Sequence, residues 1–113
     1  MHEITIASEM IRQIEKIMAD RGVSRLVSVS VEVGALSGVE REPLEFCFPY
    51  AARGTMAEDA RLFVTEVPVR VRCGACGTEG SPEYPAVLCP VCASYDVEII
   101  GGQDCVIRNL EVR

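Results

Sequence analysis

The chain has little positive charge, a single histidine and no long apolar run. Its 113 residues carry 17 acidic against 11 basic side chains, a formal net charge of -6 at pH 7. This balance argues against a surface that tracks phosphates or anionic lipids as the main function. The sequence also lacks both a span long enough to cross a bilayer and the basic, then apolar, pattern of a signal peptide, so it predicts a cytoplasmic protein.

The scarcity of histidine also limits the chemistry. The one imidazole, His2, lies beside the amino terminus, and four of the six cysteines form closely spaced pairs that a metal ion would occupy. No nucleophile with a neighbouring general base is left over. We therefore expect no enzyme activity.

Apolar spacing predicts a first helix over residues 6 to about 21, with Thr5 as its N-cap and Gly22 just past its end. Its buried face would be formed by Ile6, Met10, Ile11, Ile14, Ile17 and Met18. This pattern is typical of one amphipathic helix on a core.

A second helix is predicted to begin with Pro43 at its first position and to end before Gly54. Its apolar face would contain Leu44, Cys47, Phe48 and Ala51. Pro49 falls inside it, gives up an amide donor and crowds the carbonyl of Glu45, so we expect a kink or a short helix.

Alternation of valine with polar residues predicts a strand over 26–34, and a further strand is expected over about 60–67. Near the carboxyl end, a hairpin through Gly101 and Gly102 would join 97–100 to 105–112. The predicted fold class is α/β, or α+β in two layers, with two helices packed on a small mixed sheet.

Two C-x-x-C pairs, "CGAC" and "CPVC", are separated by twelve residues and predict a tetrahedral thiolate site. Its ligands would be Cys73, Cys76, Cys89 and Cys92. Structural zinc is the leading interpretation, with rubredoxin-like iron and a redox disulfide as alternatives. We expect residues 70–94 to form a zinc-ribbon-like minidomain inserted into a domain made of 1–69 and 95–113. Cys47 and Cys105 belong to no pair and are expected to be small buried hydrophobes.

The amino terminus offers a second donor set. The amine of Met1 and the backbone and imidazole nitrogens of His2 could close fused chelate rings around Ni(II) or Cu(II), and Glu3 could complete the set. The alternatives are structural. His2 would then be an exposed terminal residue, Glu3 a helix-dipole acid, and Glu40, in "SGVE", part of a capping box.

Taken together, "MHE", "VEVGALSGVE", "EPLEFCF" and the two cysteine pairs resemble the HypA/HybF family of nickel metallochaperones. The resemblance implies that the chain binds Ni(II) transiently and delivers it for maturation of [NiFe]-hydrogenase, and in some organisms also of urease. It implies nickel ligands at Met1, His2 and Glu3, with Glu40 as an additional ligand or nearby acid. It also implies structural Zn(II) on the four paired cysteines.

The same resemblance implies two partners, the GTPase HypB and the precursor of the hydrogenase large subunit, and no nucleic acid or membrane. We expect a monomer or a weak homodimer. The chain departs from the family at Pro49 and in lacking a histidine close to a cysteine pair. An alternative function is a zinc-ribbon adaptor in a protein or nucleic-acid complex, although only Arg70 and Arg72 flank the ribbon as cations.

Overall fold

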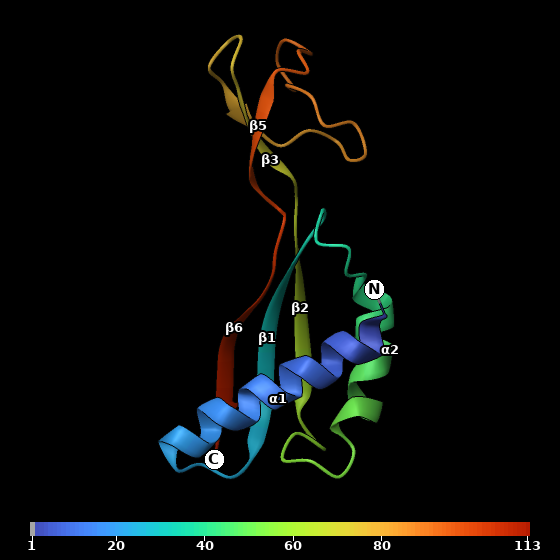
Figure 1. Ribbon diagram of the computed structural model, residues 1–113, viewed down its shortest axis with the longest axis vertical. Helices are drawn as coiled ribbons and strands as arrows, with labels where there is room; N and C mark the ends of the chain where they lie inside the picture. The colour runs from blue at the N-terminus through green and yellow to red at the C-terminus, as the bar shows by residue number, and fades with distance from the viewer. Residues whose placement is uncertain (1) are drawn as a thin grey trace.

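The computed structural model describes residues 2–113 and is elongated, with extents of 51 × 26 × 17 Å. A sheet covered by two helices forms one end, and a smaller sheet forms the other (Figure 1). In chain order the elements are α1 (Glu3–Arg21), β1 (Leu26–Gly34), α2 (Arg41–Ala52), β2 (Arg61–Val67), β3 (Arg70–Cys73), β4 (Glu79–Gly80), β5 (Val97–Gly101) and β6 (Cys105–Val112).

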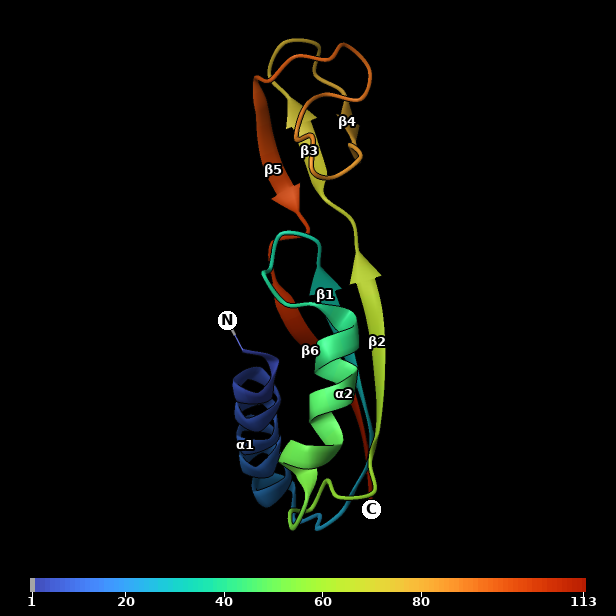
Figure 2. The ribbon, with the colours of Figure 1, turned by 90° about the vertical axis from the view of Figure 1, so that its right-hand side faces the viewer.

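The larger sheet is mixed and has the order β2-β1-β6. Its central strand, β1, runs parallel to β2, with Val31 opposite Val64, and antiparallel to β6, with Val31 opposite Ile107. Both helices lie on one face of this sheet (Figure 2). The predicted two-layer arrangement of two helices on a small mixed sheet is confirmed.

The core lies between the two helices and β1. It contains Ala7, Met10, Ile11, Ile14 and Met18 of α1, Val29, Val31 and Val33 of β1, and Leu44, Phe48 and Ala52 of α2. The predicted position of Ile17 was wrong, because its side chain is 42% exposed, and Ile6 is only half-buried. Residues 7, 11, 14 and 18 follow the 3.6-residue period and share one face, which leaves Ile17 at the margin.

The start of α1 also differs from the prediction. His2, not Thr5, is the N-cap, since its carbonyl accepts hydrogen bonds from the amides of Thr5 at 3.1 Å and Ile6 at 3.3 Å. The predicted end is confirmed, because Gly22 follows Arg21 with φ of 67°. Within residues 2–113, no helix combines the length and apolar character needed to cross a bilayer.

α2 begins at Arg41, so Pro43 is its third residue and not its first. Proline is tolerated there because the amides of a first helical turn have no partner within the helix. Pro49 lies inside α2, and the helix ends at Ala52, three residues later. Cys47 is half-buried on this helix.

The predicted hairpin between 97–100 and 105–112 was wrong. β5 pairs with β3 in the smaller sheet, whose order is β4-β3-β5, while β6 pairs with β1 in the larger one. Gly102, with φ of 86°, lies where the chain crosses between the sheets, and a Cβ atom there would approach the Pro68 carbonyl oxygen to 2.5 Å. A Cβ atom on Gly34 would approach the Gly102 carbonyl oxygen to 2.4 Å. The glycines permit a backbone crossing rather than a tight turn.

Candidate metal sites

The first cysteine pair begins at Cys73, the last residue of β3, and the second lies on a loop; each loop folds around its first sulfur. Cys73 Sγ accepts the amides two and three residues further on, at 3.3 and 3.4 Å, and Cys89 Sγ accepts the corresponding amides at 3.4 and 3.4 Å. Cys73 and Cys89 are buried, whereas Cys76 and Cys92 are exposed. The small or proline residues between the cysteines allow this tight turn.

The two loops match residue by residue beyond the cysteines. The amides of Gly77 and Ala93, each four residues after the first cysteine of its pair, donate to the carbonyls of Cys73 at 3.0 Å and Cys89 at 2.9 Å. Gly77 has φ of 77° and Ala93 has φ of 64°, so both occupy the left-handed region. Sequence reasoning missed Ala93, although its spacing from Cys89 equals that of Gly77 from Cys73.

The four sulfurs converge, as the spacing predicted. All four Sγ atoms lie within 4.8 Å of one another. Cys73 Sγ is 3.6 Å from Cys92 Sγ, and Cys76 Sγ is 3.6 Å from Cys89 Sγ. Tetrahedral zinc with bonds of about 2.3 Å would hold neighbouring sulfurs about 3.8 Å apart. The cluster therefore fits a closed four-thiolate zinc site.

The protonation of the metal-free cluster is uneven. Hydrogen bonds from Thr78 lower the pKa of Cys76 to about 6. The Ser94 amide favours the Cys92 thiolate, but the neighbouring thiols of Cys73 and Cys89 outweigh it and raise the pKa of Cys92 to about 12. Cys76 therefore ionises more readily than Cys92, whose proton must be lost when a metal binds. Zinc affinity is therefore expected to rise with pH.

The cations beside the cluster are ion-paired. Arg70 and Arg72 contact Glu79, with N–O distances of 3.6 and 3.1 Å, and Arg72 lies 3.8 Å from Glu98. These are the two arginines that a nucleic-acid adaptor would need. Their carboxylate neighbours offset the positive charge that would contact phosphate.

Two residues of the predicted nickel set, Glu3 and Glu40, meet at the start of α2. Glu3, the half-buried first residue of α1, accepts a hydrogen bond on Oε2 from the Glu40 amide at 3.2 Å. His2, which is exposed, directly precedes Glu3. Met1 lies outside the described residues. The structure thus brings the Glu3 carboxylate to the Glu40 backbone next to His2, but among residues 2–113 the ligand atoms of His2, Glu3 and Glu40 do not converge as the four cysteine sulfurs do.

The alternative role of Glu40 in a capping box was wrong. Glu40 is the N-cap of α2, with extended backbone, but its side chain makes no capping hydrogen bond among residues 2–113. Ser37 does not cap α2 either, because its Oγ donates to the Gly34 carbonyl at 2.7 Å and accepts the Val39 amide at 3.2 Å. The Glu40 side chain is exposed and left without a structural role in the helix.

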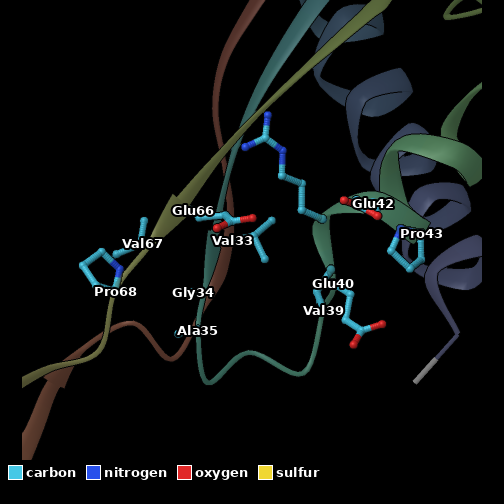
Figure 3. Close-up of a pocket in the computed structure, with 11 residues that line it drawn as sticks. Val33, Gly34, Ala35, Val39, Glu40, Glu42, Pro43, Glu66, Val67 and Pro68 are labelled. Atoms are coloured by element: carbon cyan, nitrogen blue, oxygen red, sulfur yellow. The ribbon is translucent and has the colours of Figure 1, made fainter. Parts of the chain in front are cut away.

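A cavity of about 700 Å³ lies next to this loop, between the ends of β1 and β2 and the start of α2. Figure 3 shows Glu40 at its margin, with the carboxylate directed away from Glu66. Glu42 and Glu66 belong to the cavity lining as well. The Glu40 carboxylate therefore lies on the side of the loop away from Glu66, while its amide contacts Glu3.

Fold and sites together define a two-layer protein with a small second sheet that carries a four-cysteine metal site. A family profile described as "Hydrogenase/urease nickel incorporation, metallochaperone, hypA" matches residues 1–112. The chain belongs to the HypA family, a family of nickel metallochaperones and not of enzymes. The predicted family is confirmed.

Individual relatives agree. The chain is 38% identical over 112 residues to the hydrogenase maturation factor HypA of Chlorobium limicola, covering 99% of this chain and 97% of the relative. It is 38% identical to that of Geobacter sulfurreducens, covering 99% of each. The solution structure of the Ni metallochaperone HypA from Helicobacter pylori shares the fold, with a TM-score of 0.71 at 23% identity, over 99% of this chain and 97% of that one.

Proposed function

We propose that this chain carries Ni(II) on an amino-terminal chelate and passes it to a hydrogenase precursor during maturation. The donors are the Met1 amine, the backbone and imidazole nitrogens of His2, and Glu3 through its carboxylate or its backbone nitrogen, with Glu40 as an additional oxygen donor or nearby acid. Nitrogen and oxygen donors of this kind suit Ni(II). The chelate needs a free amine on Met1, which any residue added before Met1 would remove.

One observation supports this proposal most directly. The Glu3–Glu40 hydrogen bond joins segments 37 positions apart and brings the loop before α2 to Glu3, the residue that follows the exposed His2. An exposed site at a chain end lets a partner displace the protein's ligands one by one. Such access favours release of the ion, which a carrier requires.

The four cysteines would hold a structural Zn(II) rather than the cargo. Their sulfurs form a closed set and two of them are buried, so zinc there has no open position for exchange. We infer that the segment around the cluster is a separate folding unit. The division into 70–94 and 1–69 plus 95–113 stays a prediction.

The maturation role requires partners that supply and accept the nickel. We propose the GTPase HypB and the hydrogenase large subunit precursor in these positions, with urease as a further target. The chain would act in the cytoplasm as a monomer or weak homodimer.

Calorimetric titration with Ni(II) tests the proposal on three zinc-loaded proteins: the native chain, His2→Ala, and a version with one residue added before Met1. We expect nickel binding in the native protein alone, because His2→Ala removes the imidazole and the added residue moves the amine out of the chelate. Zinc content should stay the same in all three.

Glu42→Ala provides the control, since it removes an exposed acid from the first turn of α2 without touching the donor set. It should bind nickel like the native chain. Equal nickel binding by His2→Ala, by the extended protein and by the native chain would overturn the proposed site.

A further inference from the structure

Glu3 bridges the starts of both helices. Its backbone begins α1, while its carboxylate Oε2 lies 3.2 Å from the amide nitrogen of Glu40, the N-cap of α2. The partial positive charge at the beginning of each helix favours a carboxylate in this position. Within residues 2–113, this is the side-chain hydrogen bond that links the amino-terminal segment to the loop before α2.

The loop on the other side of this bond is held by its backbone. The amide of Ala35 donates to the Val67 carbonyl at 2.9 Å, and the amide of Leu36 donates to the Gly102 carbonyl at 2.7 Å. Ser37 adds two further bonds inside the loop. The loop thus has a defined start, and the Glu3 contact defines its end at Glu40.

The two acids of the proposed nickel site differ in what their side chains do. The Glu3 carboxylate is half-buried and holds a backbone amide, while the Glu40 carboxylate is exposed and caps nothing among the described residues. The contact made through the Glu40 amide leaves its carboxylate available for a metal. The Glu3 carboxylate is therefore suited to position the loop, and the Glu40 carboxylate to bind the metal.

We propose that Glu3 is a positioning residue, whose carboxylate holds the Glu40 amide and thereby keeps the Glu40 carboxylate next to the amino-terminal chelate. Its side chain is not a nickel ligand. This inference rests on the proposed function, and it gives a positioning task to the side chain of Glu3, which the family resemblance implies to be a ligand.

Two substitutions separate the roles. Glu3→Gln keeps the length and an oxygen that can accept the Glu40 amide, but loses the carboxylate that a ligand role needs. Glu3→Ala loses both. We expect Glu3→Ala to weaken nickel binding about tenfold, the scale of a lost hydrogen bond to a charged group, and Glu3→Gln to weaken it less than about threefold.

The matched control is again Glu42→Ala, which removes an acid from the start of α2 without removing a bond to Glu40. A double-mutant cycle adds the decisive comparison. Glu40→Ala removes the carboxylate but keeps the backbone amide that Glu3 holds. If Glu3 acts through Glu40, Glu3→Ala should cause no further loss of affinity in the Glu40→Ala protein.

A second readout does not depend on nickel. Hydrogen exchange of the Glu40 amide, measured by NMR on the zinc-loaded protein without nickel, should be faster in Glu3→Ala than in the native chain and in Glu3→Gln. A thermal transition measured in parallel shows whether any variant is simply unfolded.

The inference is overturned if Glu3→Gln loses as much affinity as Glu3→Ala while its Glu40 amide stays protected, because the carboxylate would then be a ligand. It is also overturned if the losses from Glu3→Ala and Glu40→Ala add up, or if Glu3→Ala leaves the Glu40 amide protected. Absence of nickel binding by the native chain would instead contradict the proposed function. Hydrogen exchange of the Glu40 amide would still show whether Glu3 holds it.

Discussion

The two candidate metal sites are built on opposite plans. Each pair of sulfurs in the cysteine cluster is placed by one short loop, and the donors of one pair are three residues apart. The acids of the amino-terminal site come from segments 37 positions apart and meet through one hydrogen bond. The local backbone fixes the geometry of the first site, whereas the geometry of the second depends on how α1 packs against α2.

This difference matches the two tasks proposed for the metals. A closed set of four thiolates with two buried sulfurs keeps its ion as part of the fold. The proposed amino-terminal chelate, exposed and supported by one long-range contact, would release its ion to a partner without unfolding of the core. Substitutions at one end of the molecule can therefore test whether the other end stays intact.

The largest effect is expected from Cys73→Ala. Loss of one thiolate should release the zinc, whose binding contributes on the order of 10 kcal/mol in small zinc-dependent units, and should unfold β3, β4 and β5. Zinc content and amide NMR spectra would show loss of the smaller sheet and retention of the larger one. Cys47→Ala, outside the cluster, should keep its zinc. Retention of zinc by Cys73→Ala would contradict the closed site.

A smaller effect is expected at the opposite end from Phe48→Ala. Phe48 is 2% exposed between the helices and the sheet, so truncation should cost about 3–5 kcal/mol in the free energy of unfolding. Phe46→Ala is the matched control on the same helix, because Phe46 is 69% exposed and its truncation should change stability little. Denaturant unfolding measures both.

If the two ends are independent, Phe48→Ala should lower the midpoint for the larger sheet while zinc stays bound to the smaller one. Parallel loss of zinc and of the larger sheet in this variant would show that the two ends unfold together.

The smallest effect is expected within the cysteine loops. Ala93 and Gly77 occupy equivalent positions in the two cysteine loops, and both have a positive φ. This backbone conformation costs an alanine about 1 kcal/mol relative to glycine. Ala93→Gly should therefore strengthen zinc retention against a chelator, and Gly77→Ala should weaken it by a similar amount. Since a Cβ atom at Gly77 would meet nothing within 4 Å, the change isolates the backbone conformation. Changes of the same sign in both variants would contradict this account.

Local patterns in the sequence predicted the local structure well. The alternation through Val29, Val31 and Val33 placed β1, and the spacing of the cysteines predicted a cluster whose sulfurs do converge. Both features depend on residues close together in the chain, where backbone period and loop length fix the geometry.

Predictions failed where a residue or strand has more than one possible hydrogen-bonding partner and the tertiary structure decides between them. Gly101 and Gly102 fit a hairpin, but Val71 pairs with Ile99, so the strand before the glycines joins the other sheet. Thr5 is a good N-cap by residue type, yet the His2 carbonyl already accepts the first helical amides. The contact between Glu3 and Glu40 had no signal in the sequence, because it forms only when two helix starts come together.

The backbone crossing between the sheets has a consequence for how such a chain can diverge. At Gly34 and Gly102 any side chain would run into main-chain atoms within 2.4 to 2.5 Å, and those atoms belong to the crossing itself. Substitution there cannot readjust the angle between the two ends. Variation in their relative placement has to come from insertions or deletions on either side of the joint, so alignment gaps should gather around these glycines while the glycines themselves persist.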